Sequence, residues 1–154
     1  MIKNRVAIIG CGNIGLSIIQ GLLKAKTIPA KNITATRRNI HELDHLKESG
    51  IRLTIDNINA VNEADLIVIA VKPYNIASVL EEIKDHLNPG KHILISVTAG
   101  IPIRQIQDVI GIQVPVFRAM PNISASVGKS VSCVSHNGAK TNEIDSLKYL
   151  FDII

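Results

Sequence analysis

Three glycines at fixed spacing constrain the fold of this chain more than any other feature. The segment Gly10-Cys11-Gly12-Asn13-Ile14-Gly15 directly follows an apolar run at residues 6–9 and precedes apolar residues that repeat at helical spacing. In such a strand-to-helix turn, Gly10 permits the tight turn, Gly12 has no Cβ to block a pyrophosphate, and Gly15 lets helix and strand pack closely. The N-terminus of the helix attracts anions through free backbone N–H groups and the helix dipole. The sequence therefore predicts a dinucleotide-binding loop rather than an ordinary turn.

Short apolar runs alternate with segments of helical periodicity along the chain, which is typical of an α/β domain with a parallel sheet. The uninterrupted apolar run at 66–71 predicts a central strand that is buried on both faces, and 115–119 predicts an edge strand. The other expected strands are 5–9, 33–36, 52–54, 92–97 and 131–135, and the expected helices lie near 14–26, 41–48, 74–87, 103–110 and 140–154. We therefore predict that 1–154 is one dinucleotide-binding domain with a Rossmann-type, doubly wound α/β fold: a mainly parallel sheet with helices on both faces.

Composition and charge exclude several classes of function. Aromatic residues make up only 3% of the chain and its net charge is +4 with scattered Lys and Arg, so it lacks the basic runs and stacking platforms of nucleic-acid-binding proteins. No apolar run approaches the ~20 residues of a membrane span. Two distant cysteines, Cys11 and Cys133, favour a reducing compartment. We expect a cytoplasmic protein that binds a small molecule, with no nucleic acid and no membrane as partner.

The segment after the second predicted strand bears on the choice of dinucleotide. In NAD-binding proteins, an acidic residue about 20 residues after the glycine loop binds the ribose hydroxyls. This chain has Thr34-Ala35-Thr36-Arg37-Arg38-Asn39 there, with no acid and two arginines. A guanidinium group can form paired hydrogen bonds with a 2′-phosphate, so we predict NADP, with NADPH preferred over NADH. The alternative is that the arginines are solvated surface charges, and the sequence does not decide which of the two binds the phosphate.

Four segments together resemble pyrroline-5-carboxylate reductase, which reduces a cyclic imino acid to proline in the last step of proline biosynthesis. They are Ile8-Ile9-Gly10-Cys11-Gly12-Asn13-Ile14-Gly15, Val71-Lys72-Pro73, Ser96-Val97-Thr98-Ala99-Gly100-Ile101 and Arg118-Ala119-Met120-Pro121-Asn122. The resemblance implies an NADP-dependent oxidoreductase that transfers a hydride from NADPH to the imine carbon of 1-pyrroline-5-carboxylate. It also implies a homo-oligomer with a helical C-terminal dimerisation and substrate domain. This chain is expected to end before that domain, to bind NADP, and to reduce the substrate poorly alone.

The resemblance also implies which residues bind the cofactor, at the carboxyl ends of the strands. Arg37 and Asn57 would contact the adenosine end, and residues 70–73 would line the ribose and nicotinamide side. The predicted cofactor-binding set is Ile9, Gly10, Cys11, Gly12, Asn13, Ile14, Gly15, Arg37, Arg38, Asn57, Ala70, Val71, Lys72, Pro73, Ala99 and Gly100, with Met120, Pro121 and Asn122 on the substrate side. No catalytic residue is named. No metal site is expected, and His41 and His45 are interpreted as surface residues.

Some of these residues have simpler interpretations. Asp56-Asn57 can cap a short helix at 58–61, because both side chains accept backbone hydrogen bonds. Lys72 is interpreted as a main-chain ligand before Pro73 at a first helical position, in preference to a catalytic residue. Cys11 occupies a slot where a small residue suffices, and a reactive thiolate is not expected there.

Two other functions are open at this point. One is another NADP-dependent reductase of the same superfamily, such as a coenzyme F420-dependent NADP reductase or a hydroxyacid dehydrogenase. The other is a non-catalytic nucleotide-binding module. The apolar residues Phe151, Ile153 and Ile154 are expected to be exposed and to need a continuation or a partner, which argues against the module.

Overall fold

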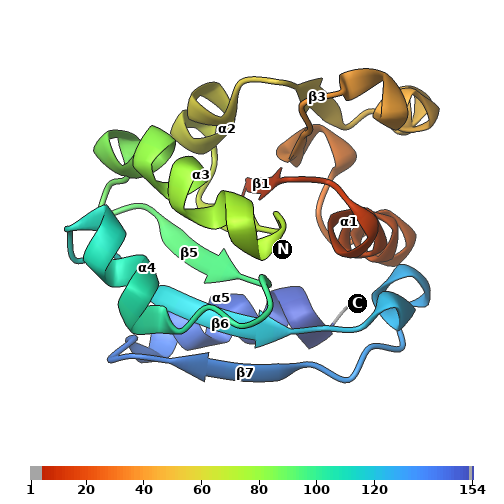
Figure 1. The fold of residues 1–154 in the computed structure, drawn as a ribbon. Helices are drawn as coiled ribbons and strands as arrows, with labels where there is room; N and C mark the ends of the chain where they lie inside the picture. The colour runs from red at the N-terminus through yellow and green to blue at the C-terminus, as the bar shows by residue number, and fades with distance from the viewer. Residues whose placement is uncertain (1–4, 153) are drawn as a thin grey trace.

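Seven short strands form one sheet in the computed structural model, which describes residues 5–152 and 154 (Figure 1). The strand order is β3-β2-β1-β4-β5-β6-β7, and every neighbouring pair is parallel except β6 and β7. The strands are β1 (Val6–Ile9), β2 (Ile33–Thr36), β3 (Arg52–Thr54), β4 (Leu66–Ile69), β5 (Ile93–Ser96), β6 (Val116–Met120) and β7 (Cys133–His136). The predicted central position of the run at 66–71 is confirmed, although the strand itself ends at Ile69.

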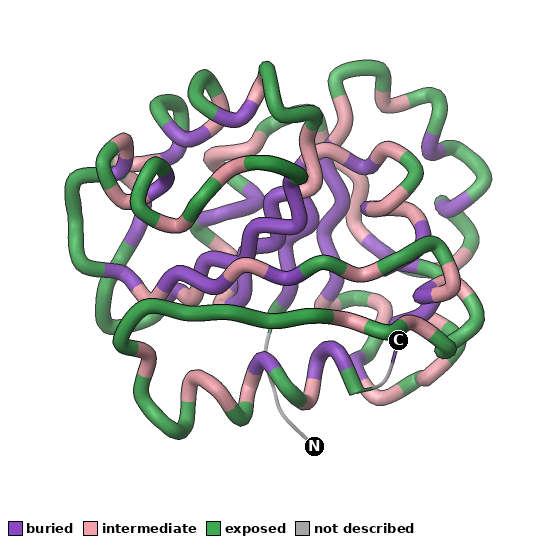
Figure 2. The backbone as a smooth tube through the Cα atoms, turned by 60° about the horizontal axis from the view of Figure 1, so that its bottom comes forward, coloured by how far each residue is buried: buried purple, intermediate pink, exposed green. Residues whose placement is uncertain are grey.

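The prediction of an edge strand at 115–119 is wrong. Strand β6 pairs with β5 on one side and with the antiparallel β7 on the other. The strand expected at 131–135 forms at Cys133–His136 and takes the edge position. Residues of β7 are exposed throughout, as an edge strand allows, and Figure 2 shows buried strands in the centre of the molecule with an exposed outer strand.

Helices cover both faces of the sheet, as the sequence predicts. The α-helices are α1 (Asn13–Ala25), α2 (Asn57–Glu63), α3 (Ile76–Ile83), α4 (Ile103–Ile110) and α5 (Thr141–Asp152). Short 3-10 helices are η1 (Ala30–Asn32), η2 (Ile40–Ser49), η3 (Pro73–Asn75), η4 (Lys84–His86) and η5 (Ile123–Val127). The doubly wound Rossmann-type fold is therefore confirmed.

Alternate residues of each central strand point to two separate cores. In β1, Val6 and Ile8 pack in a core with α1, η2 and α5, whereas Ala7 and Ile9 pack in a core with α2, α3 and α4. Both cores consist mainly of aliphatic side chains, which suits a sheet that is covered on both faces.

Two predicted α-helices contain 3-10 segments instead. Residues Ile40–Ser49 form η2, and only Leu43 and Leu46 of this segment are buried. Their spacing of three residues matches the repeat of a 3-10 helix, so burying this pair does not require an α-helix. The helix expected at 74–87 is divided into η3, α3 and η4, and its terminal turns are 3-10.

The expectation of an exposed apolar C-terminus is wrong for the described residues. Phe151 and Ile154 are buried, with 7% and 3% of their surfaces exposed, and Ile153 lies outside the described residues. Both side chains join the core that also contains α1. Their apolar character is therefore explained by packing within the domain, and it no longer argues against a free-standing nucleotide-binding module.

The chain changes direction across the sheet at β1. From β1 it proceeds outward to β2 and β3, and then crosses over to β4 on the other side of β1. Such a reversal leaves a crevice at the carboxyl ends of the two central strands, and ligands of open α/β sheets bind there. The glycine loop follows β1, and Ala70 follows β4, so two predicted segments meet at this point.

Candidate cofactor-binding site

The turn after β1 is shaped by contact with the turn after β4. Gly10 has a φ of +85°, and a Cβ on Gly10 would lie 2.3 Å from Cγ1 of Val71. A Cβ on Gly15 would lie 3.2 Å from the Gly10 carbonyl oxygen and 3.4 Å from Cγ2 of Ile8. At Gly12, by contrast, a Cβ would meet no described atom within 4 Å. Packing accounts for Gly10 and Gly15, whereas Gly12 borders the open space that an approaching pyrophosphate requires.

Strand β2 holds the backbone of the glycine loop. The N–H groups of Gly10 and Cys11 both donate to the carbonyl oxygen of Thr36, at 3.2 and 2.9 Å, and the Gly12 N–H donates to the Gly10 carbonyl at 2.7 Å. These three N–H groups are therefore occupied within the protein, and the anion-binding donors must come from the helix that follows.

The first turn of α1 supplies those donors. The N–H groups of Asn13, Ile14 and Gly15 open the helix and have no preceding helical carbonyl to bond. Gly12 caps the helix without a side-chain hydrogen bond, and the first turn carries no acidic residue. The positive end of this 13-residue helix is thus left for an external anion.

Cys11 bonds to Thr36 and Arg37 through its backbone, and its thiol is buried. Its side chain is fully buried, with Sγ 3.4 Å from the carbonyl oxygen of Ile8. Burial raises the pKa of the Cys11 thiol to about 12, so the group stays protonated at neutral pH. The expectation that this cysteine is unreactive is supported, while its carbonyl oxygen accepts a hydrogen bond from Arg37.

Arg37 forms a hydrogen bond with the glycine loop, and Arg38 is exposed. Nη1 of Arg37 donates to the Cys11 carbonyl at 2.7 Å, and its Nη2 pairs with a carboxylate oxygen of Glu42. The Arg37 side chain is 27% exposed, whereas Arg38 is exposed. The sequence does not predict the contact with Glu42. This residue lies five positions after Arg37 in η2, where the sequence predicts an α-helix and the structure has a 3-10 helix.

Asn57, the first residue of α2, forms hydrogen bonds with residues of β2 and α3. Its Oδ1 accepts a hydrogen bond from Oγ1 of Thr36 at 2.7 Å, and its Nδ2 donates to Glu82 at 3.0 Å. The cap of α2 is Asp56, whose carboxylate accepts from the Asn59 N–H at 2.8 Å. The capping interpretation is confirmed for Asp56, and Asn57 is instead held at the carboxyl end of β2, close to the loop that Thr36 also binds.

The turns after β4 and β5 are tied together at the same edge of the sheet. Oγ1 of the buried Thr98 donates to the Val71 carbonyl at 3.2 Å, a contact that sequence reasoning did not identify. Lys72 is exposed and caps η3 without a side-chain bond, and Pro73 is the first residue of that helix, as expected. Ala99 and Gly100 of the second turn are also exposed.

The segment predicted on the substrate side follows β6. Met120 is 39% exposed, and the Oδ1 of Asn122 caps η5 by accepting from the Ser124 N–H at 2.9 Å. Arg118 is paired with Ser96 in the strand register and so lies level with the end of β5. Its Nε is buried without a hydrogen-bond partner in the described part of the chain.

Other features lie apart from this site. A cavity of about 580 Å³ is lined mainly by residues of β7, of the segment before it and of α5, and no residue of the glycine loop is among them. His41 and His45 are exposed, which confirms them as surface residues. Within residues 5–152 and 154, no three His, Cys, Asp or Glu side chains group together as metal ligands would. None of the helices described in that range is long and apolar enough to cross a membrane.

Comparison with known proteins identifies similar chains. Pyrroline-5-carboxylate reductase 1 of Dictyostelium discoideum is 32% identical to this chain over an alignment of 163 positions that covers 98% of the chain and 29% of that protein. Pyrroline-5-carboxylate reductase 2 of the same organism is 37% identical and is matched over 87% of the chain and 46% of its own length. The chain thus spans about half the length, or less, of these curated relatives.

Solved structures show the same fold over the whole chain. A pyrroline-5-carboxylate reductase from Coxiella burnetii has a TM-score of 0.91 and 29% identity, over 99% of this chain and 57% of that one. The Plasmodium falciparum pyrroline carboxylate reductase with NADP bound has a TM-score of 0.85 and 22% identity, over 99% and 55% of the two chains. The second likeness shows the fold alone.

One protein family model, described as NADP oxidoreductase coenzyme F420-dependent, matches residues 5–100. The matched range contains the glycine loop, Arg37, Asn57 and both turns that follow β4 and β5. The similarity to pyrroline-5-carboxylate reductases extends beyond it and confirms the resemblance that the motifs predict. Because the family model covers more than half of the chain, the chain belongs to the NADP oxidoreductase, coenzyme F420-dependent family.

Proposed function

We propose that this chain is the NADP-binding part of an enzyme that reduces 1-pyrroline-5-carboxylate to proline by hydride transfer from NADPH. The observation that carries the proposal is the extent of the similarity to pyrroline-5-carboxylate reductases, which reaches 98% of the chain. It therefore includes the segment at 120–122, which lies outside the range of the family model.

The geometry of the site supports NADP as the cofactor. The unneutralised N-terminus of α1 suits the pyrophosphate, and Arg37, held against the loop by the Cys11 carbonyl, suits the 2′-phosphate. A preference for NADPH over NADH follows from that arginine. The contact set we propose is the one that the sequence predicts, from Ile9 to Gly15 with Arg37, Arg38, Asn57, Ala70, Val71, Lys72, Pro73, Ala99 and Gly100, and with Met120, Pro121 and Asn122 on the substrate side.

The protein's own part in the reaction is to bind and orient. When bound, NADPH would supply the hydride for the imine carbon, and the ring nitrogen would take a proton. The hydrogen bond from Thr98 to the Val71 carbonyl fixes the two turns where the nicotinamide side is expected. We assign Lys72 a main-chain role; its side chain is exposed and does not cap η3.

The substrate pocket and the assembly are proposals about the whole protein. The matched relatives are about twice as long as this chain or longer, which supports a further domain. That this domain completes the substrate pocket and forms a homo-oligomer is part of the proposal. The proton donor to the imine nitrogen would then lie outside these residues. A cytoplasmic location is also proposed, since Cys11 is buried and Cys133 is exposed and both are free thiols.

A second candidate is reduction or oxidation of coenzyme F420 with NADP, which the description of the family model favours. That model stops at residue 100 and does not distinguish the two activities in this chain. Both candidates use the same glycine loop and the same arginine, so the cofactor site alone cannot separate them.

The two candidates predict different substrates for the protein as its gene encodes it. With NADPH and 1-pyrroline-5-carboxylate, we expect loss of NADPH absorbance together with formation of an equal amount of proline. With reduced coenzyme F420 and NADP, we expect no NADPH to form. Reduction of NADP by reduced F420 without any proline formation would overturn the proposal in favour of the second candidate.

A further inference from the structure

The guanidinium group of Arg37 is held from two sides. On one side, Nη1 donates to the Cys11 carbonyl of the glycine loop at 2.7 Å. On the other side, Nη2 forms an ion pair with the carboxylate of Glu42, which is 48% exposed. The arginine that bonds to the glycine loop therefore already has an anionic partner.

The position of Glu42 is fixed by the turn that carries it. Asn39 caps η2 at its N-terminus, and the Glu42 N–H donates to the Asn39 carbonyl at 3.3 Å. The Asn39 Nδ2 in turn donates to Oε1 of Glu42 at 3.1 Å. The side chain of Asn39 thus orients the Glu42 carboxylate, which faces Arg37 with its other oxygen. The Arg37–Glu42 ion pair is therefore part of the local structure at the proposed adenosine end of the cofactor site.

This inference rests on the proposed binding of NADP. We infer that Glu42 is a specificity-determining residue that competes with the cofactor's 2′-phosphate for Arg37 and so lowers the preference of the site for NADPH over NADH. A phosphate monoester carries between one and two negative charges at neutral pH, and the Glu42 carboxylate repels it. The carboxylate also occupies a donor that the phosphate would otherwise accept from. NADH has no 2′-phosphate, so its binding avoids this competition.

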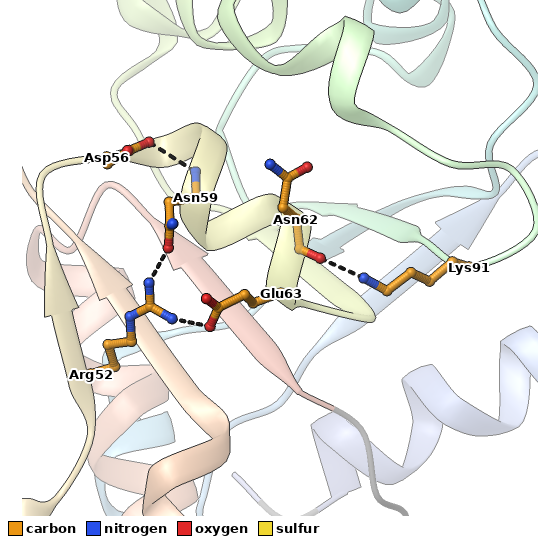
Figure 3. A network of polar contacts seen from close by, with 6 residues as sticks. All are labelled: Arg52, Asp56, Asn59, Asn62, Glu63 and Lys91. Carbon is orange, nitrogen blue, oxygen red and sulfur yellow. Dashed lines mark hydrogen bonds and ion pairs between the residues drawn. The ribbon is translucent and has the colours of Figure 1, made fainter.

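A second arginine–glutamate pair provides a matched control. Arg52 pairs with Glu63 and also donates to Oδ1 of Asn59, as Figure 3 shows. Glu63 is 46% exposed, close to the exposure of Glu42. Arg52 is the first residue of β3 and Glu63 is the last residue of α2. The pair therefore lies toward the amino ends of the strands, whereas the glycine loop lies at their carboxyl ends. Replacing either glutamate by glutamine removes the same charge and preserves the side-chain size.

The experiment compares NADPH and NADH binding to the unsubstituted chain, E42Q and E63Q by isothermal titration calorimetry. For E42Q we expect the Kd of NADPH to fall about two- to fivefold, the upper range for a partly exposed ion pair, while the Kd of NADH changes by less than about twofold. For E63Q we expect both values to stay unchanged. The gain for E42Q should shrink at high salt, because screening weakens both the pair and the repulsion.

A double variant tests whether the effect passes through Arg37. In an R37Q background, E42Q should lower the Kd of NADPH no more than E63Q does in the same background. The E63Q variant measures the general effect of removing one negative charge. NADPH binding to E42Q that is unchanged or weaker, while the unsubstituted chain binds both cofactors, would overturn the inference and leave the proposed function intact. Failure of the unsubstituted chain to bind NADPH at all would overturn both.

Discussion

At the scale of single residues, the three glycines of the loop are needed for different reasons. Gly10 combines a φ of +85° with close contact to Val71, and Gly15 touches the backbone of the loop itself. Gly12 has ordinary backbone angles, with a φ of −83°, and no described atom lies near the place of a Cβ. The protein's own packing therefore does not require a glycine at position 12, but the proposed cofactor does.

Substitution of these glycines should separate stability from binding. Gly10→Ala should lower the free energy of unfolding by about 1–3 kcal/mol, because it adds left-handed strain and overpacking against Val71. Gly12→Ala should lower it by less than about 1 kcal/mol, as expected for a helix cap, and yet weaken NADPH binding. Urea unfolding and calorimetric titration of both variants measure the two effects. If Gly12→Ala bound NADPH as well as the unsubstituted chain, the pyrophosphate would not approach the loop at this position.

His92 makes the turn before β5 sensitive to pH. It is buried, its Nδ1 accepts a hydrogen bond from the Asn88 N–H at 3.0 Å, and its Nε2 has no partner among the described residues. Burial, with the nearby charge of Lys91, lowers the pKa of His92 from its ordinary value of 6.5. At His92, the unfolded chain therefore binds a proton near pH 6.5, whereas the folded chain binds it only at lower pH. The contribution of neutral His92 to the free energy of unfolding is complete above pH 6.5 and is lost as the pH falls below that value.

Unfolding by urea above and below pH 6.5 tests this dependence. The unsubstituted chain should lose more stability on acidification than His92→Gln, in which position 92 no longer titrates. His45→Gln serves as the control for the loss of a histidine side chain, since His45 is exposed and, unlike His41, forms no ion pair with another described residue. Equal losses in the unsubstituted chain and His92→Gln would show that another group titrates instead.

At the scale of whole elements, the position of α1 depends on its contact with η5. A Cβ on Gly21 would lie 2.2 Å from the carbonyl oxygen of Ala125, and Nζ of Lys24 donates to the Val127 carbonyl at 3.2 Å. Alanine usually stabilises a helix relative to glycine, so helix propensity and packing make opposite predictions at position 21. We expect packing to dominate, because the clash is with backbone that cannot rotate away.

Gly21→Ala should therefore lower the free energy of unfolding by about 1–3 kcal/mol, the range for overpacking, despite its better helix propensity. Gln20→Ala, at an exposed position in the same helix, should change stability by less than about 0.5 kcal/mol. Thermal or urea unfolding of the two variants provides the measurement. A Gly21→Ala variant as stable as the unsubstituted chain would mean that α1 and η5 can move apart at little cost.

Elements with a strong periodic pattern agree with their sequence-based predictions, and irregular ones do not. The apolar runs of β1 and β4 and the amphipathic helices α1 and α4 form where expected. The segment at 41–48 was expected to be an α-helix but is part of a 3-10 helix, since two leucines three residues apart fit either geometry. The edge position of the strand at 115–119 was wrong because strand order depends on pairing between distant segments, and local periodicity carries no information about it.

At the scale of the whole molecule, this chain should bind the cofactor without completing the reaction. The proposed cofactor contacts lie within one domain, whereas the matched relatives are about twice as long or longer. NADPH should raise the melting temperature of the 154-residue chain, and the same chain should reduce 1-pyrroline-5-carboxylate poorly or not at all. Thermal shift and a turnover assay on one preparation test both statements. A normal turnover rate from residues 1–154 alone would contradict the proposal that the reaction needs residues outside this range.

The sequence by itself determined the fold class, the glycine loop and the family resemblance, because these depend on residue types at short, fixed spacings. Tertiary structure decided which arginine reaches the loop: Arg37 and Arg38 are adjacent in sequence, and only the former bonds to the Cys11 carbonyl. It also revealed Glu42, Thr98 and Glu82 at the site, whose partners Arg37, Val71 and Asn57 lie 5 to 27 residues away. Those contacts arise from the turns at the carboxyl ends of parallel strands, and their positions follow only once the strands are paired.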